Sequence, residues 1–309
     1  MFPDSIIPKE WGWGIDIYLY GICMAVGILA CFGFLMFTMW KKNFNEDATD
    51  KILLIGVFGT GFGIFAAMLF QSVYNYIADP SPNKIFKLEG MTFIGGLIGG
   101  VVSFLTVYFL YIYVIAPRTK IKLLQNNMNA TLTDALPFIP IGIVIAHAFG
   151  RLGCFFAGCC FGGPTDAWYG LPCANATVVI NGVSTNLRGV NVVPTQLFEC
   201  LFLVALGVVM AVLYFKFRFN YNFGLYAIAY GVWRFIIEYV RVDDRGEMFP
   251  GAKLYPSQIW SIVMVIAGIA FIFLQYYVLS KHMKHPELQE SVYKKKNAEP
   301  AATDNSSAE

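Results

Sequence analysis

The chain has 309 residues, of which 57% are hydrophobic and only 14% are charged, and its formal net charge is +2. A soluble domain carries about 25% charged residues, so this composition argues against a water-soluble fold. The small net charge, without a basic stripe interleaved with aromatic residues, argues against nucleic acid as a partner.

Seven apolar segments follow one another along the chain. About 20 apolar residues cross a bilayer as one helix, and each segment reaches or approaches that length. The fourth is short and is broken by Pro137 and Pro140. We therefore predict an all-α polytopic membrane protein with about seven transmembrane helices, at residues 16–39, 52–77, 92–115, 134–150, 194–217, 222–241 and 256–279.

The positions of lysine and arginine predict how these segments are oriented. Cytoplasmic loops carry an excess of positive residues, and the richer set of loops contains Lys41, Lys51, Arg118, Lys216 and the C-terminal tail. We expect the N-terminus outside and the C-terminus in the cytoplasm. The start of the chain lacks a basic n-region and its first apolar run is long, so we expect no cleavable signal.

The chain also divides by composition. Residues 1–285 make up the predicted transmembrane domain. Residues 286–309 are polar, with Lys, Pro, Ser and Ala and almost no apolar side chains. Such a segment cannot bury enough apolar surface to fold, so we interpret it as a disordered cytoplasmic tail.

The third predicted helix opens with a glycine-rich stretch that contains Gly95, Gly96, Gly99 and Gly100. Small residues at this spacing let helices approach closely in a membrane. We expect a packing face here, which also leaves room for lipid tails to enter between helices.

The stretch HAFGRLGCFFAGCCFGG, residues 147–163, places Arg151 at the end of the fourth segment. Gly150, Gly153 and Gly158 permit close backbone approach and unusual dihedral angles. We interpret this stretch as a loop around a ligand head group. The alternative is an interfacial arginine that extends to lipid phosphates.

Four cysteines follow or belong to the same stretch: Cys154, Cys159, Cys160 and Cys173. An external location permits disulfides, and we favour at least one bridge. Zinc binding, a nucleophilic role for Cys159 and plain packing are the alternatives, and the spacing is not the C-x2-C pair of common zinc sites. We expect no bound metal and no cofactor.

The fifth segment begins with Pro194, which suits the first turn of a helix. Gln196 and Glu199 follow it, and Glu199 lies about one turn inside. A carboxylate at that depth is costly, so it either makes a polar contact between helices or serves a site.

In the sixth segment, Arg234, Glu238 and Arg241 recur at i, i+4 and i+7, which places them on one face of a helix. A charge near the bilayer centre costs about 2.5–3.5 kcal/mol on insertion scales. The three residues form either a buried network or an anion site, because arginine binds phosphate in a bidentate manner. With Arg151 they place three arginines at one membrane face, which favours a phosphate pocket.

These stretches together resemble the prolipoprotein diacylglyceryl transferase family of bacterial inner-membrane enzymes. The matching fragments occur in the family's order along most of the chain. Each fragment alone is a weak signal, but together and in this order they are specific to the family. The matching fragments are Tyr20-Gly21, GMTFIGGLIG at residues 90–99, Asp134 with Pro137, GRLG at 150–153, PTQLFE at 194–199, Arg234 with Glu238 and Arg241, and SQIWS at 257–261.

The sequence also departs from the family pattern. Ile94 and Val193 stand where the family has histidines. Cys154, Ala157 and Cys159 stand where it has two asparagines and a glutamate, and the second segment lacks the family's arginine. These differences suggest a divergent branch with a rebuilt site, or one that acts on another acceptor.

The resemblance implies transfer of a diacylglyceryl group from phosphatidylglycerol to the thiol of a lipobox cysteine in a precursor protein, with release of glycerol phosphate. A same-fold enzyme with another acceptor, and a non-enzymatic binder or transporter of anionic lipid, are the alternatives. The expected catalytic residues are Arg151, Arg234, Glu238, Arg241, Glu199 and His147. The expected substrate-binding residues are Tyr20, Gly95, Gly96, Gly150, Gly153, Gln196 and Arg151.

The base that activates the thiol stays open at this point. His147 lies one helical turn before Arg151, and its ordinary pKa near 6.5 suits a base. A histidine near a helix end also serves as a simple hydrogen-bonding group. The field of the arginines is a further way to favour the thiolate.

Overall fold

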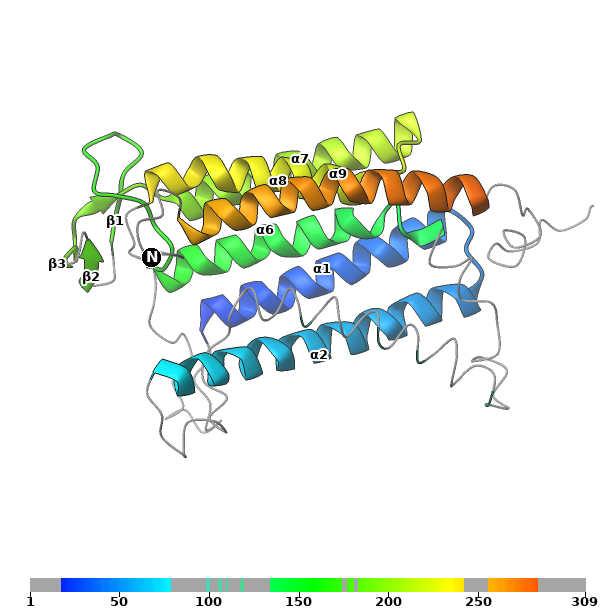
Figure 1. The fold of residues 1–309 in the computed structure, drawn as a ribbon, viewed down its shortest axis with the longest axis horizontal. Coiled ribbons are helices and arrows are strands. Elements are labelled where there is room, and N and C mark those ends of the chain that lie inside the picture. The colour runs from blue at the N-terminus through cyan, green and yellow to red at the C-terminus, as the bar shows by residue number, and fades with distance from the viewer. Residues whose placement is uncertain are drawn as a thin grey trace, which may run out of the picture. The chain divides into compact units, whose positions relative to one another are not determined.

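The structure is a computed structural model that describes residues 18–78, 134–173, 177–180, 183–241 and 255–282, with the single positions 99, 106, 110 and 118. Six long α-helices occur in this part of the chain (Figure 1). They are α1 (Leu19–Lys41), α2 (Glu46–Ala78), α6 (Ile139–Ala157), α7 (Thr195–Phe217), α8 (Asn222–Ile237) and α9 (Pro256–His282). The chain divides into two compact units, residues 1–38 with 135–284, and residues 39–134 with 285–309.

The predicted all-helical membrane protein is confirmed. Five helices are long and apolar enough to cross a bilayer: α1, Thr49–Val73 within α2, α6, α7, and Ser257–Tyr277 within α9. At 16 residues, α8 is shorter than these. Apart from three isolated positions, the predicted helix at 92–115 lies outside the described residues, as does the tail at 286–309. The count of seven and the orientation of the termini therefore stay predictions.

The fourth predicted helix differs in its bounds. The sequence suggested residues 134–150, whereas α6 runs from Ile139 to Ala157. Pro140 lies in the first turn, where a missing N–H costs no hydrogen bond. Gly158 ends the helix in the left-handed conformation, with φ of 67°. The GRLG stretch therefore lies inside the helix, and the prediction of a loop there was wrong.

Glycines bring α1 and α6 close together. A Cβ atom added at Gly27 would lie 2.7 Å from Cβ of Phe149, and one added at Gly153 would lie 3.1 Å from Cδ2 of Tyr20. From Tyr20 to Gly27 the residue numbers rise along α1, while those of the contacting residues on α6 fall from Gly153 to Phe149. The two helices are therefore antiparallel. Gly153 is needed here for helix packing.

The contact between α8 and α9 depends on small residues in the same way. A Cβ atom at Gly231 would lie 2.9 Å from Cγ2 of Val265, and one at Gly224 would collide with Ile272. Small residues allow this approach, and dispersion contacts then hold the helices together in a membrane. In the second unit, Gly99 meets Ala66 of α2, as the packing interpretation of the glycine-rich stretch predicted.

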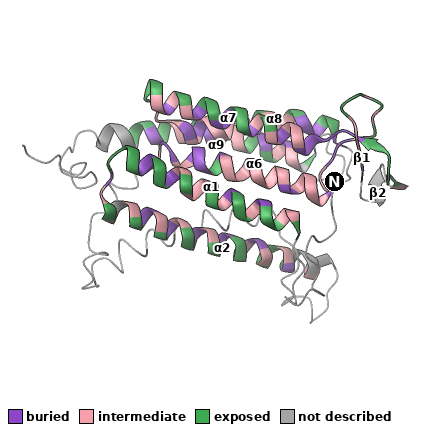
Figure 2. Ribbon diagram, turned by 180° about the vertical axis from the view of Figure 1, so that it is seen from behind, coloured by how far each residue is buried: buried purple, intermediate pink, exposed green. Residues whose placement is uncertain are grey.

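The helices present apolar side chains outward and polar side chains inward. Leu201 is 66% exposed and Phe273 is 70% exposed, whereas Gln196, Glu199 and Gln258 are each 1% exposed. Figure 2 shows exposed positions recurring along the helices. This distribution suits a lipid solvent, because lipid accepts apolar surface and cannot satisfy buried hydrogen-bonding groups.

The segment between α6 and α7 contains short strands that the sequence analysis did not predict. Strands β1 (Leu171–Pro172) and β4 (Asn191–Val192) pair antiparallel, as do β2 (Thr177–Ile180) and β3 (Val183–Asn186). An Asn-Gly pair between two runs rich in Val, Ile, Ser and Thr is a hairpin signal that was present in the sequence. A small apolar cluster lies in this segment: Phe161, Cys173, Leu187 and Val192.

Candidate active site

Buried charged side chains gather at one end of the first unit, where α6 and α8 end and α1, α7 and α9 begin. The strands β1 to β4 lie at the same end (Figure 1). Glu199, Glu238 and Arg241 are 1%, 4% and 7% exposed. Burying a charged side chain is costly unless an oppositely charged or hydrogen-bonding group pairs with it. The residues that pair with these side chains therefore show the extent of the site.

Arg151 belongs to a closed network that joins three helices. Its Nη2 atom lies 3.1 Å from Oε1 of Glu199 on α7 and donates to the hydroxyl of Tyr230 on α8 at 2.9 Å. The Tyr230 hydroxyl in turn donates to Oε1 of Glu199 at 2.7 Å. The three groups hold one another in a single arrangement, and 13% of the Arg151 side chain stays exposed.

Arg234 lies in the last turn of α8 and pairs with Glu238, with Nη2 and Oε2 2.9 Å apart. Its Nη1 atom is buried and has no hydrogen-bond partner among the described residues. Arg234 also interacts electrostatically with Arg241, Glu199 and Tyr230. This guanidinium therefore retains one N–H donor without a protein acceptor among the described residues.

The backbone conformation at Arg241 differs from the helix that was predicted. The sequence placed Arg234, Glu238 and Arg241 on one face of a continuous helix. Instead, α8 ends at Ile237, a 3-10 turn follows at Glu238–Val240, and Arg241 is extended, with φ of −84° and ψ of 146°. The prediction of a single helical stripe was wrong.

The reason for the early end of α8 lies in main-chain pairing. Gly162 forms an antiparallel bridge with Arg241, and the Gly163 N–H donates to the Val240 carbonyl at 3.1 Å. Pairing of this kind requires extended backbone, which the helix cannot supply. It brings the Arg241 side chain into hydrogen-bonding contact with Cys160 and into electrostatic contact with Arg234. The three arginines thus lie in one region, although Arg151 and Arg234 belong to two different helices and Arg241 lies on extended backbone.

His147 lies one turn before Arg151 on α6 and contacts two tyrosines. Its Nδ1 atom is 2.9 Å from the Tyr226 hydroxyl, and its ring meets that of Tyr230 edge-on with centroids 4.6 Å apart. The sequence analysis missed both tyrosines. Their spacing held a signal, because residues 226, 230 and 234 repeat every four positions and so share one helix face.

The expected substrate-binding residues are distributed as follows. Gln196 Nε2 donates to the Cys159 carbonyl at 2.5 Å, and its buried Oε1 has no partner within the described part of the chain. Tyr20 packs on Gly153, and Gly150 lies near Met24. Gly95 and Gly96 fall outside the described residues. Gly150 and Gly153 are therefore positions inside α6 that face α1.

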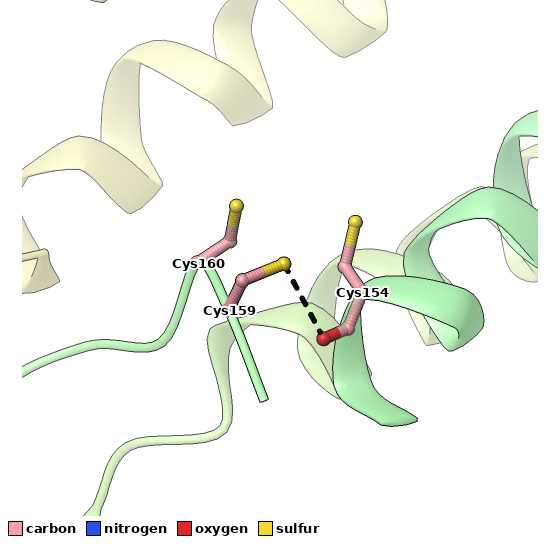
Figure 3. Close-up of side chains that lie close together, drawn as sticks. All are labelled: Cys154, Cys159 and Cys160. Carbon is pink, nitrogen blue, oxygen red and sulfur yellow. Dashed lines mark hydrogen bonds between the residues drawn. The ribbon is translucent and has the colours of Figure 1, made fainter. Parts of the chain in front are cut away.

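None of the seven cysteines, which all lie in the described part of the chain, forms a disulfide, so the favoured bridge is not present in the structure. Cys154, Cys159 and Cys160 instead have their sulfur atoms within 4.8 Å of one another (Figure 3). Cys173 belongs to the apolar cluster with Phe161, Leu187 and Val192. Hydrogen bonds from the thiols of Cys154 and Cys159 lower the pKa of the Cys160 thiol, and the Arg241 guanidinium adds to this effect.

Comparison with known proteins identifies the family of the chain. The model of the prolipoprotein diacylglyceryl transferase family matches residues 9–274. The chain belongs to this family. It is a multi-pass membrane transferase.

Named relatives support the same placement. A phosphatidylglycerol–prolipoprotein diacylglyceryl transferase of Clostridium tetani is 30% identical over 265 residues, which cover 84% of this chain and 93% of the relative. One from Dehalococcoides mccartyi is 28% identical over 276 residues, which cover 88% of this chain and 94% of the relative. The similarity thus extends over nearly the full length of both relatives.

Proposed function

We propose that the chain transfers the diacylglyceryl group of phosphatidylglycerol to the thiol of a lipobox cysteine in a prolipoprotein, in the bacterial inner membrane. The names of the relatives state both substrates. The observation that carries the proposal is the gathering of Arg151, Arg234 and Arg241 at one end of the helices. A phosphodiester head group is the lipid feature that such a cluster recognises.

The reaction replaces a carbon–oxygen bond with a carbon–sulfur bond. The thiolate sulfur attacks the glycerol carbon of the diacylglyceryl group that bears the phosphate ester. The carbon–oxygen bond breaks, and its electron pair stays on the phosphate oxygen of the leaving glycerol phosphate. The thiol proton passes to solvent or to the leaving group. The products are a thioether and glycerol phosphate.

The arginines stabilise the phosphate as negative charge develops on the leaving oxygen. Donors aimed at the position of developing charge usually make the largest single contribution to catalysis. Arg234 has a buried Nη1 atom without a partner among the described residues, so it offers a donor without breaking its pair with Glu238. Arg151 holds its position through Glu199 and Tyr230 while part of it stays exposed.

The carboxylates act as positioning residues in this arrangement. Glu199 is occupied by Arg151 and Tyr230, and Glu238 by Arg234. His147 is likewise bound to the Tyr226 hydroxyl, which supports a positioning role for it too. The incoming thiol then depends on the positive field of the arginines to favour the thiolate.

The predicted orientation places this end of the helices at the outer face of the membrane. A secreted precursor presents its lipobox cysteine at that face. The lipid reaches the site from the side, between helices, because its tails cannot leave the bilayer core. This geometry brings both substrates to the arginines from different directions.

A reconstituted transfer assay tests the proposal. Vesicles contain the purified protein and labelled phosphatidylglycerol, a lipobox peptide is the acceptor, and mass spectrometry detects the thioether product. We expect Arg151→Ala to slow transfer by about 100-fold or more. Arg188→Ala is the matched control, because Arg188 is an exposed arginine of the strand-containing segment.

Two outcomes would contradict these assignments separately. Arg151→Ala that transfers at the wild-type rate would remove Arg151 from the mechanism. A wild-type protein that forms no thioether, with or without release of glycerol phosphate, would contradict the function itself. Insertion of each variant into the membrane is verified by protease protection.

A further inference from the structure

Three thiols lie together beside the arginine cluster, and the proposed transfer does not use them. The sulfur atoms of Cys154, Cys159 and Cys160 lie within 4.8 Å of one another, and all three residues are half-buried. Figure 3 shows the three cysteine side chains next to one another. We propose that these cysteines form a binding site for a thiophilic divalent cation, with Zn²⁺ as its occupant.

The spacing of the sulfur atoms fits such an ion. A zinc–sulfur bond of about 2.3 Å places two ligand sulfurs about 3.8 Å apart around a tetrahedral centre. Sulfur atoms that already lie within 4.8 Å of one another need only small side-chain rotations to close on the ion. Thiolate ligands also select zinc over magnesium and calcium, which prefer oxygen.

The backbone that carries two of these cysteines is held in place by α7. Thr195 Oγ1 donates to the Cys160 carbonyl at 2.7 Å, and Gln196 Nε2 donates to the Cys159 carbonyl at 2.5 Å. The loop is therefore ordered before any metal binds, which lowers the entropy lost when the ligands close.

Cys160 also has an unusual backbone conformation. Its φ of 65° lies in the left-handed region, which is unfavourable for a residue other than glycine. Such conformations persist where the surroundings over-determine them, and they cluster at functional sites. Here the conformation turns the chain so that the thiol of Cys160 lies near that of Cys154 on α6 (Figure 3).

The neighbouring charges suit a metal–thiolate complex. Three thiolates and one divalent cation together carry a single negative charge. Arg241 contacts Cys160, and Arg151 interacts electrostatically with Cys154 and Cys160. Guanidinium groups at this range stabilise an anionic complex, whereas they would repel a divalent cation held by neutral ligands.

The ligand set leaves one coordination position open. No fourth histidine, cysteine or carboxylate joins the group within the described part of the chain. Three protein ligands and an open position are typical of zinc ions that bind water or a substrate group, whereas structural zinc sites are closed by four. The ion would also join the end of α6 to the segment that contains the strands.

Metal analysis of the full-length protein tests the site. The protein is isolated under reducing conditions and equilibrated with Zn²⁺, and bound metal is measured by elemental mass spectrometry. We expect one zinc ion per chain, and binding weaker by about 100-fold or more in Cys154→Ser and Cys160→Ser. Cys200→Ser, a half-buried cysteine of α7 outside the cluster, should bind as the wild type does. Equal zinc binding in the wild type and Cys154→Ser would overturn the proposal.

A second measurement does not depend on the variants folding. Co²⁺ added to the wild type should produce a sulfur-to-cobalt charge-transfer absorption that Zn²⁺ removes. Zn²⁺ should also protect Cys154, Cys159 and Cys160 from alkylation while Cys200 still reacts. Lack of the absorption, or a disulfide between two of the three cysteines when thiols are alkylated directly in membranes, would overturn the proposal. Because zinc binding does not rest on the transfer reaction, its outcome is separate from that of the activity assay.

Discussion

Tyr230 organises two charged side chains that come from different helices. Its hydroxyl accepts a hydrogen bond from Arg151 and donates one to Glu199. Tyr230 is 2% exposed, so water cannot replace the hydroxyl if it is lost. The position of the Arg151 guanidinium therefore depends on a neutral side chain.

Replacement of Tyr230 by phenylalanine tests this dependence. The variant keeps the ring but leaves the buried Glu199 and the partly exposed Arg151 with one partner fewer each, which costs about 1–3 kcal/mol. If that loss affects the transition state, transfer slows by about 10-fold to 100-fold. Tyr221→Phe, near the opposite end of α8, is the matched control. Unchanged kcat and KM in Tyr230→Phe would show that Glu199 alone positions Arg151.

Arginine and glutamate were recognisable in the sequence because a charge in an apolar segment is conspicuous. The tyrosines were less visible, since aromatic residues are common in membrane helices. His147 was found, but its partner Tyr226 was not. The sequence thus predicted each charged residue of the network one at a time. It did not predict Tyr226 and Tyr230, the neutral side chains that connect these residues by hydrogen bonds.

Among the helices, close contact at glycines decides where the site residues lie. Gly231 brings α8 against α9, and α8 carries Tyr226, Tyr230 and Arg234. Sequence identified small residues as packing positions but did not identify their partners. Two helices pack where the shapes of their facing surfaces are complementary. The sequence of one helix does not identify the helix that packs against it.

Gly231→Leu tests the contact between α8 and α9. A Cβ atom there would lie 2.9 Å from Val265 Cγ2 and 3.0 Å from the Ser261 carbonyl oxygen. We expect overpacking to lower the free energy of unfolding by about 1–3 kcal/mol, measured as a lower Tm in mild detergent. Gly33→Leu on α1 is the control, because a Cβ atom at Gly33 meets nothing within 4 Å. Equal Tm values would show that the two helices separate without loss of stability.

The bounds of α6 and α8 show where local pattern fails. The sequence pattern predicted that the fourth helix ends before Arg151, because glycines and cysteines follow that arginine. In the structure, Gly150 and Gly153 lie inside α6 and pack against α1. The pattern extended the sixth helix through Arg241, whose backbone instead pairs with Gly162. Both errors have one cause, since contacts with a distant segment overrode the local preference.

The orientation of the chain in the membrane follows from its charge distribution and can be tested directly. Lysine-rich and arginine-rich loops remain in the cytoplasm. A fluorescent protein fused after residue 284 should fluoresce in a bacterial host, and alkaline phosphatase fused after Arg188 should be active. The reverse pair of results would place the arginine site in the cytoplasm, where it would not meet a secreted precursor.

The amino-acid sequence by itself determined the membrane class, most of the helices and the charged residues of the site. These follow from composition, length and the cost of a charge in lipid, all of which act locally. Tertiary structure alone decided that Tyr230 joins Arg151 to Glu199, that Arg241 leaves the helix, and that three cysteines meet. These depend on which distant surfaces fit together, and no single segment contains that information.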